Sequence, residues 1–132
     1  MTTKTTRYET DDDDYSLFVN TCKIWIARFG LTDWCINFAH LDDIKSNSQA
    51  WVNRLYPSRS AAIVLNKNWG DTEPTAEEVK DCAIEEVLHI LLYPLLSHEN
   101  ADDKELFEEH GIIFRLINFI NSWEQSKEAI RK

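Results

Sequence analysis

The sequence has no run of about eighteen apolar residues, so we expect no transmembrane helix. The first residues, Met1 to Asp14, lack the apolar segment of a secretory signal. Cysteines are few, widely spaced and without a CxxC pair: Cys22, Cys35 and Cys82. An odd number of this kind argues against a disulfide framework and against a thiolate zinc site, and favours small buried apolar side chains. Together these absences favour a reducing, cytoplasmic location.

Basic residues are also in short supply. The chain has 14 Lys and Arg against 23 Asp and Glu, which gives a formal net charge of −9. Direct binding to a nucleic-acid backbone needs Lys and Arg, so we do not expect it. An acidic surface favours solubility and can attract a basic protein partner. GxSxG, Walker and Cys/His nucleophile motifs are missing as well, which excludes the enzyme classes that depend on them.

The composition that is present is typical of one globular domain. The chain has 132 residues, of which 43% are hydrophobic and 11% aromatic, enough for a core without disulfides. Residues 1–14 are polar and end in the acidic run Asp11 to Asp14, which predicts a disordered acidic lead. We expect residues 15–132 to form a single domain, because no repeat or linker divides them.

Apolar spacing predicts three helices. The first runs from about Tyr15 to Phe29 and stops at Gly30. The second begins with a capping box at residues 75–78 and ends near residue 93, before a proline. The third spans about residues 102–126. Its expected core side consists of Leu106, Phe107, Ile113, Phe114, Leu116, Ile117 and Ile120.

Strand signals lie between the first two helices, at residues 34–38, 50–56 and 61–66, where aromatic and β-branched residues alternate with turns. The last two favour a hairpin. The predicted fold is therefore α+β, with an N-terminal helix, a small three-stranded and mostly antiparallel sheet, and two further helices.

The segment Ala83 to Leu92 combines an apolar helix with three polar side chains. Glu85 and His89 are four residues apart and share a helix face, and Glu86 projects into the same sector. Buried charge must be paired, hydrogen-bonded or bound to metal, and a Glu/His pair at this spacing can chelate a divalent cation. The alternative is a solvent-facing polar stripe that also includes Glu78 and Asp81.

Further segments accompany this helix: Ile24–Ile26 before Phe29–Leu31, Asp33–Ile36, and Ala62–Asn66 with Trp69. With them, the chain resembles the small phage- and prophage-encoded metallopeptidases of the minimal zincin type, whose helix carries HExxH. Here Glu86 and His89 match that motif, and Glu85 stands where the family has its first His.

The resemblance implies a zincin-like active-site helix, with Glu86 as general base, His89 as zinc ligand and Glu85 as an altered ligand. It implies a gluzincin-like third ligand on the last helix, for which Glu109 is favoured. Glu108, His110 and His98 remain alternatives for that position. It also implies zinc as cofactor, a peptide or protein substrate, and the host cytoplasm as location if the chain is phage-encoded.

A carboxylate in place of a histidine lowers the Lewis acidity of a bound metal. The resemblance therefore implies a degenerate metallopeptidase-like protein with weak or lost hydrolase activity, in which zinc can be absent. Two alternatives stay open. One is an acidic pseudoenzyme that binds or inhibits a basic, nucleic-acid-handling host factor, and the other is an active zinc peptidase.

Overall fold

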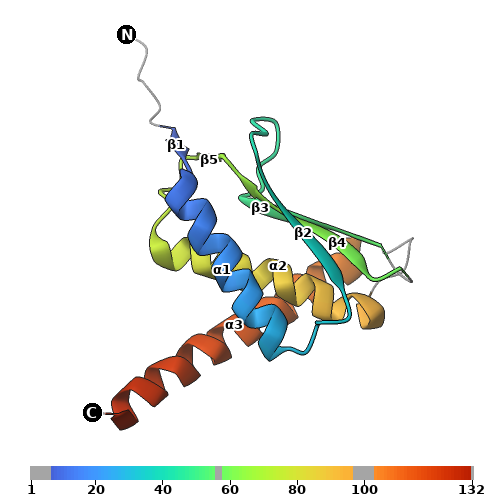
Figure 1. Ribbon diagram of the computed structural model, residues 1–132, viewed down its shortest axis with the longest axis vertical. Coiled ribbons are helices and arrows are strands. Elements are labelled where there is room, and N and C mark those ends of the chain that lie inside the picture. Colours follow the sequence, from blue (N-terminus) through green and yellow to red (C-terminus); the bar gives the residue numbers. More distant parts are fainter. Residues whose placement is uncertain (1–6, 56–57, 97–102, 132) are drawn as a thin grey trace.

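The computed structural model describes residues 7–55, 58–96 and 103–131, with the backbone alone for 94–96, 103–107 and 128–131. Figure 1 shows the order of its elements, which are β1 (Tyr8–Glu9), α1 (Asp12–Arg28), β2 (Cys35–Leu41), β3 (Ala50–Leu55), β4 (Ser60–Asn66), β5 (Asn68–Gly70), α2 (Ala76–Leu96) and α3 (Asp103–Arg131). The predicted α+β class is confirmed. None of the described helices is both long and apolar enough to cross a membrane.

The main sheet has the strand order β2-β4-β3. Strands β3 and β4 form the predicted antiparallel hairpin, with Ala50 opposite Leu65. Strand β2 pairs with β4 in parallel, with Cys35 opposite Ser60, so the sheet is mixed. The residues between β2 and β3 carry the chain past β4 and reverse its direction. A separate antiparallel ribbon, β1 with β5, was not predicted.

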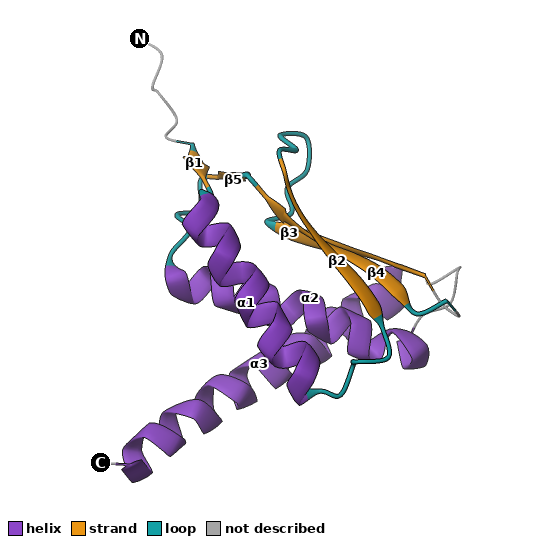
Figure 2. Ribbon diagram, in the orientation of Figure 1, coloured by secondary structure: helices purple, strands orange, loops and turns teal. Residues whose placement is uncertain are grey.

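The main core lies between the sheet and the helices, which cover one face of the sheet (Figure 2). Strand β4 has a neighbour on each side and is almost fully buried, as a continuous apolar run indicates. Its side chains meet residues of α1 and α2. The core includes Phe18, Cys22, Ile63, Leu65, Val79, Ala83, Val87 and Ile90.

A second apolar cluster joins α2 to α3. It consists of Ile84, Leu88, Ile113, Ile117 and Ile120. Helix α2 is therefore buried on two sides, which explains why its sequence is apolar nearly all round. Phe114, expected in this core, is instead 56% exposed, because it lies about 100° round the helix from Ile113. The side chains of Leu106 and Phe107 lie outside the described residues.

The predicted disordered lead is wrong for residues 7–14. Helix α1 begins at Asp12, and Asp11 is its N-cap. The Asp14 amide donates to Asp11 Oδ1 at 2.8 Å, and the Asp11 amide donates to Asp14 Oδ2 at 3.0 Å. The acidic run satisfies free amides and complements the helix dipole, so it stabilises a helix start. Residues 1–6 lie outside the described residues.

Both later helices extend beyond their predicted ends. Helix α2 continues through Pro94 to Leu96, and α3 reaches Arg131. At the start of α2, the Glu78 amide donates to Thr75 Oγ1 at 3.2 Å, which is one half of the predicted capping box. A proline in the last turn interrupts only local hydrogen bonding, so the helix can outlast it.

Two of the three cysteines are buried, as predicted. Cys22 and Cys82 lie in the core. Cys35 is exposed, contrary to the expectation, because it begins β2 and its side chain lies on the outward face of that strand.

Asn66, at the end of β4, anchors the loop between β2 and β3. It is fully buried. Its Nδ2 donates to the carbonyls of Asp43 and Ser48, both at 3.0 Å. Its Oδ1 accepts from the amides of Asp43 at 3.1 Å and Asn68 at 3.0 Å. One side chain therefore holds both ends of this loop against the end of β4.

We expect Asn66→Ala to lower the free energy of unfolding by about 2–3 kcal/mol, because several buried backbone groups lose their partners. Urea denaturation followed by circular dichroism measures this. Asn37→Ala, an exposed site on β2, is the control and should change stability by less than about 0.5 kcal/mol. Equal effects of the two substitutions would contradict the anchoring role.

Candidate metal centre

A pocket of about 380 Å³ lies between α2, α3, β3 and the loop that Asn66 anchors. Because the two apolar sides of α2 are occupied by the cores, its polar residues emerge along the remaining sector. The lining residues include Gln49, Trp51 and Arg54 from the sheet side, Cys82, Glu85, Glu86 and His89 from α2, and Glu109 and His110 from α3.

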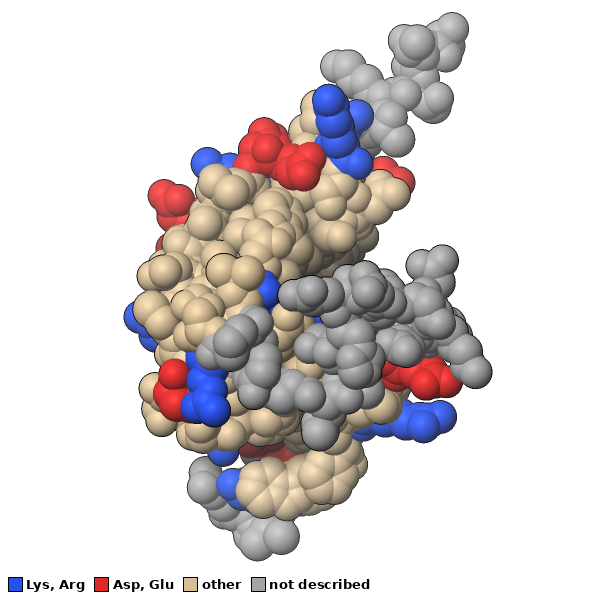
Figure 3. Space-filling model, turned by 90° about the vertical axis from the view of Figure 1, so that its right-hand side faces the viewer, with Lys and Arg blue, Asp and Glu red and all other residues tan. Residues whose placement is uncertain are grey.

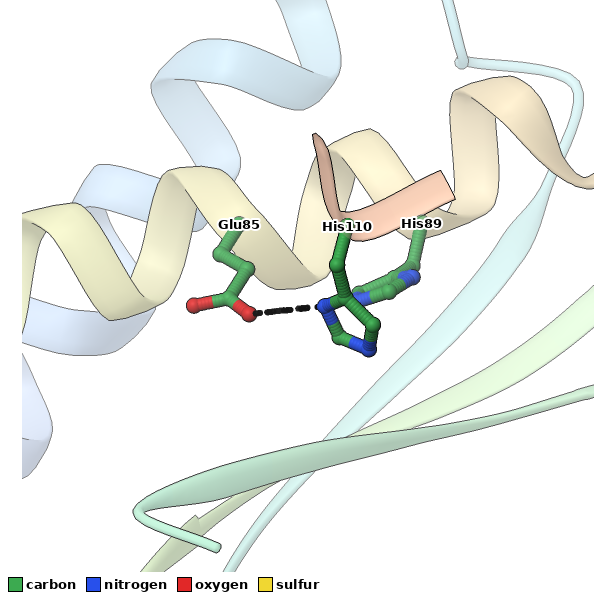
Figure 4. Close-up of side chains that lie close together, drawn as sticks. All are labelled: Glu85, His89 and His110. Carbon is green, nitrogen blue, oxygen red and sulfur yellow. Dashed lines mark ion pairs between the residues drawn. The ribbon is translucent and has the colours of Figure 1, made fainter. Parts of the chain in front are cut away.

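Three side chains in this pocket form a group with metal-ligand geometry: Glu85, His89 and His110. Figure 4 shows Glu85 and His89 on α2, with His110 reaching them from α3. Glu85 Oε1 is 3.6 Å from His110 Nδ1 and 4.0 Å from His89 Nε2. All three ligand atoms lie within 4.8 Å of one another. Ligand atoms about 2.1 Å from a tetrahedral zinc lie roughly 3.4 Å apart, so small side-chain movements would complete a site.

The proton on His89 has a defined position. His89 Nδ1 lies 2.8 Å from Glu109 Oε1. Burial raises the pKa of Glu109, but hydrogen bonds from His89 and Arg54 more than offset it and leave that pKa below its ordinary value. An ionised carboxylate can only accept, so Nδ1 carries the proton. Burial also lowers the pKa of His89, which keeps the ring neutral. The lone pair on Nε2 therefore faces Glu85.

Arg54, on β3, ties the sheet to both helices. Its Nη1 donates to Glu109 Oε1 at 3.0 Å and to the His89 carbonyl at 2.6 Å. Its guanidinium lies 4.5 Å above the ring of Tyr93. Sequence reasoning missed Arg54. The sequence contained a signal, because Val52 and Arg54 are two residues apart and therefore lie on the same face of the strand. A cation on the inward face of a strand indicates a buried carboxylate as its partner.

Glu109, favoured as the third ligand, is not part of the ligand group, and His110 is. The Glu109 side chain is only 3% exposed and is held by His89 and Arg54. It lies four residues before Ile113, on the stripe that packs against α2, whereas His110 lies about 100° further round. Glu108 is exposed, and His98 lies outside the described residues.

His89 does not belong to a solvent-facing polar stripe, which was the alternative interpretation of this helix. Glu78 is exposed, but His89 is buried, with 9% of its surface accessible. His89 makes its close contact with Glu109 rather than with Glu85. Its neighbour in the pocket, His110, lies edge-on to it with ring centroids 4.9 Å apart.

Glu86 lines the same pocket, and its carboxyl group is buried. It is 5% exposed, and no hydrogen bond between described residues involves its carboxyl oxygens. Burial, reinforced by the charge of Glu85, raises the pKa of Glu86 to about 8, although Arg54 acts in the opposite direction. Metal-free protein therefore holds Glu86 as a neutral acid at neutral pH.

Comparison with protein-family models, curated proteins and solved structures found no match for this chain. The resemblance to minimal zincins therefore stays a prediction, and the functional argument depends on the pocket itself.

The raised pKa of Glu86 predicts a pH-dependent stability in chelator-treated protein. Between pH of about 4.5 and about 8 the unfolded chain ionises this group while the folded chain keeps it protonated. Folding stability then falls as pH rises across that window. We expect Glu86→Gln to remove this loss, so that the folding stability of the variant relative to the parent protein increases as pH rises.

Denaturant unfolding at several pH values across the window measures the effect. Glu108→Gln, an exposed site on α3, controls for the removal of one acidic side chain. A constant difference between parent and Glu86→Gln at every pH would contradict the raised pKa.

Proposed function

We propose that the protein binds a divalent transition-metal ion, with zinc the best match, and acts as a zincin-like hydrolase of low activity. One observation carries the proposal. His89 donates a hydrogen bond from its Nδ1–H to Glu109, and its Nε2 lies toward Glu85 and His110. Histidines that bind metals typically donate their other ring N–H to a carboxylate in this way.

The donor set fits zinc. Two imidazole nitrogens and one carboxylate oxygen are ligands that zinc accepts, and three protein ligands leave a fourth position for water or substrate. The pocket also has an excess of acidic groups, with Glu85, Glu86 and Glu109 against the single guanidinium of Arg54. A divalent cation would balance that charge.

Zinc, when bound, supplies Lewis acidity and lowers the pKa of a coordinated water. Glu86 is the candidate general base, because its carboxyl lines the same pocket and makes no hydrogen bond to another described residue. A neighbouring positive charge favours the ionised form of a carboxyl group, in which Glu86 can accept a proton from water. The negative charge of Glu85 reduces the acidity of the centre, and this motivates the proposed low activity.

The proposed substrate is an extended peptide. Strand β3 is an outer strand of the described sheet and also lines the pocket through Trp51, Val52 and Arg54. No described strand pairs with its outer edge, which can accept a peptide by strand addition. Such a peptide would run past the ligand group.

The alternative of a basic protein partner gains no support from the face shown in Figure 3. Among the described residues of that face, acidic and basic side chains are interspersed, with no single acidic patch. We therefore retain the metal-dependent function as the proposal.

Protein purified without a metal-affinity tag should bind close to one zinc ion per chain, measured by elemental analysis and titration calorimetry. His89→Ala and His110→Ala should each abolish this binding, because each removes a ligand. Glu109→Gln should weaken it by roughly 10- to 100-fold through loss of the histidine's partner. Glu108→Ala is the matched control, one residue from Glu109 and two from His110, and should bind normally. Zinc retained by both histidine variants would sink the proposed centre.

Glu86→Gln should keep the zinc and lose at least about a hundredfold in peptide cleavage, because the amide cannot accept the proton. Zinc-loaded protein and a peptide library analysed by mass spectrometry provide the measurement. Unchanged cleavage would refute the role of Glu86. Absence of cleavage in zinc-loaded parent protein would refute the hydrolase while leaving the metal centre intact.

A further inference from the structure

Helix α3 has a second apolar stripe that the domain covers only in part. It consists of Ile112, Leu116, Phe119 and Trp123, spaced by four, three and four residues. Ile112 is 38% exposed, Phe119 66% and Trp123 49%. Ile113, Ile117 and Ile120 face α2, and Leu116 also packs against that cluster, so the second stripe lies beside this contact. A spacing of this kind is the seam of helices that pair with other helices.

The second stripe of α3 borders a groove of about 550 Å³ between α3 and the other two helices. Its opposite wall comes from α1 and α2 and includes Trp25, Phe29, Leu88 and Leu91. Figure 1 shows that the C-terminal part of α3 runs beyond the body of the domain. The groove therefore continues the exposed stripe and is accessible along the helix.

We propose that a second copy of this chain covers this surface, with its α3 lying antiparallel in the groove. From Ile112 to Trp123 the stripe is only about 16 Å long, less than the three or four heptads that an isolated coiled coil needs. A helix from the second copy must therefore also contact the groove walls on α1 and α2. A two-fold arrangement supplies this contact twice, because each α3 fills the groove of the other copy.

The stripe is complementary to itself when reversed. Antiparallel pairing sets Ile112 level with Trp123 of the second copy, and Leu116 level with Phe119. Each aromatic side chain then meets an aliphatic one, so the combined side-chain volume is similar at each level of the seam. Parallel pairing would instead put Trp123 against Trp123 and Phe119 against Phe119.

The charges of α3 favour the same direction. Glu108 and Lys127 lie near the two ends of the stripe, and both are exposed. Reversal sets Glu108 of one copy level with Lys127 of the other, whereas parallel pairing would set each of these residues beside its own counterpart. Lys127 borders the groove, with its ammonium 3.7 Å from the ring of Trp123. Because the whole chain carries −9, two copies repel at long range, and added salt should strengthen the dimer.

Sedimentation equilibrium of the full chain over a roughly hundredfold range of concentration, at low and high salt, tests the dimer. The parent protein should pass from one-chain to two-chain mass, at lower concentration in high salt. Phe119→Asp should weaken dimerisation at least about tenfold. Phe114→Asp is the matched control, because Phe114 is 56% exposed on α3, against 66% for Phe119, but lies outside the stripe and the groove.

Cross-linking tests the direction of pairing in a Cys35→Ser background, which removes the exposed native thiol. A mixture of Ile112→Cys and Trp123→Cys proteins should form a mixed disulfide under mild oxidation, and neither protein alone should cross-link. Homotypic cross-links alone would overturn the antiparallel arrangement. One-chain mass at every concentration and salt, with folded protein by circular dichroism, would overturn the dimer and leave the groove to a different molecule.

Discussion

The contact of Glu109 with His89 and Arg54 is the interaction on which the pocket depends. It joins β3, α2 and α3 at one carboxylate oxygen, at 2.8 Å and 3.0 Å. The Glu109 side chain is 3% exposed and that of Arg54 18%, so removing either partner would leave a charge largely without water. The same contact fixes the tautomer of His89. Structural support and the proposed metal-site chemistry therefore share one carboxylate.

Charge balance in the pocket follows from this arrangement. The described lining has three carboxyl groups and one guanidinium, that of Arg54. Glu86, which is buried and makes no hydrogen bond to another described residue, responds by holding its proton. The alternative response to a surplus of buried negative charge is to bind a cation. Glu85 and His110 lie at the more open side of the pocket, with side chains 25% and 47% exposed, where an ion from solvent could enter. Protonation and metal binding are thus two solutions to the same electrostatic problem.

The packing of α2 and α3 determines which of their faces remain for the pocket and the groove. Helix α2 packs on the sheet and α1 by one side and on α3 by another, so its polar residues must share the sector that opens into the pocket. Helix α3 buries one apolar stripe fully and the other only in part. The exposed residues of its second stripe, with the groove beside them, would be covered by pairing between copies.

Much of the fold could be predicted because local pattern carries it. Apolar spacing located three helices and the β3–β4 hairpin, and the helical period alone placed Glu85, Glu86 and His89 in one sector. Local pattern failed where contacts are distant in sequence. The parallel pairing of β2 with β4 and the ribbon of β1 with β5 depend on segments that meet only in the folded chain.

The sequence by itself determined which helix carries the polar residues, that the chain is acidic, and that one of its helices must be buried. Only the tertiary structure decided between Glu109 and His110. These neighbours differ by about 100° around α3, and the packing of Ile113, Ile117 and Ile120 against α2 sets the rotation of that helix. This rotation turns Glu109 inward to Arg54 and His89, and leaves His110 facing Glu85. No local pattern specifies it, because it depends on how two helices and a strand fit together.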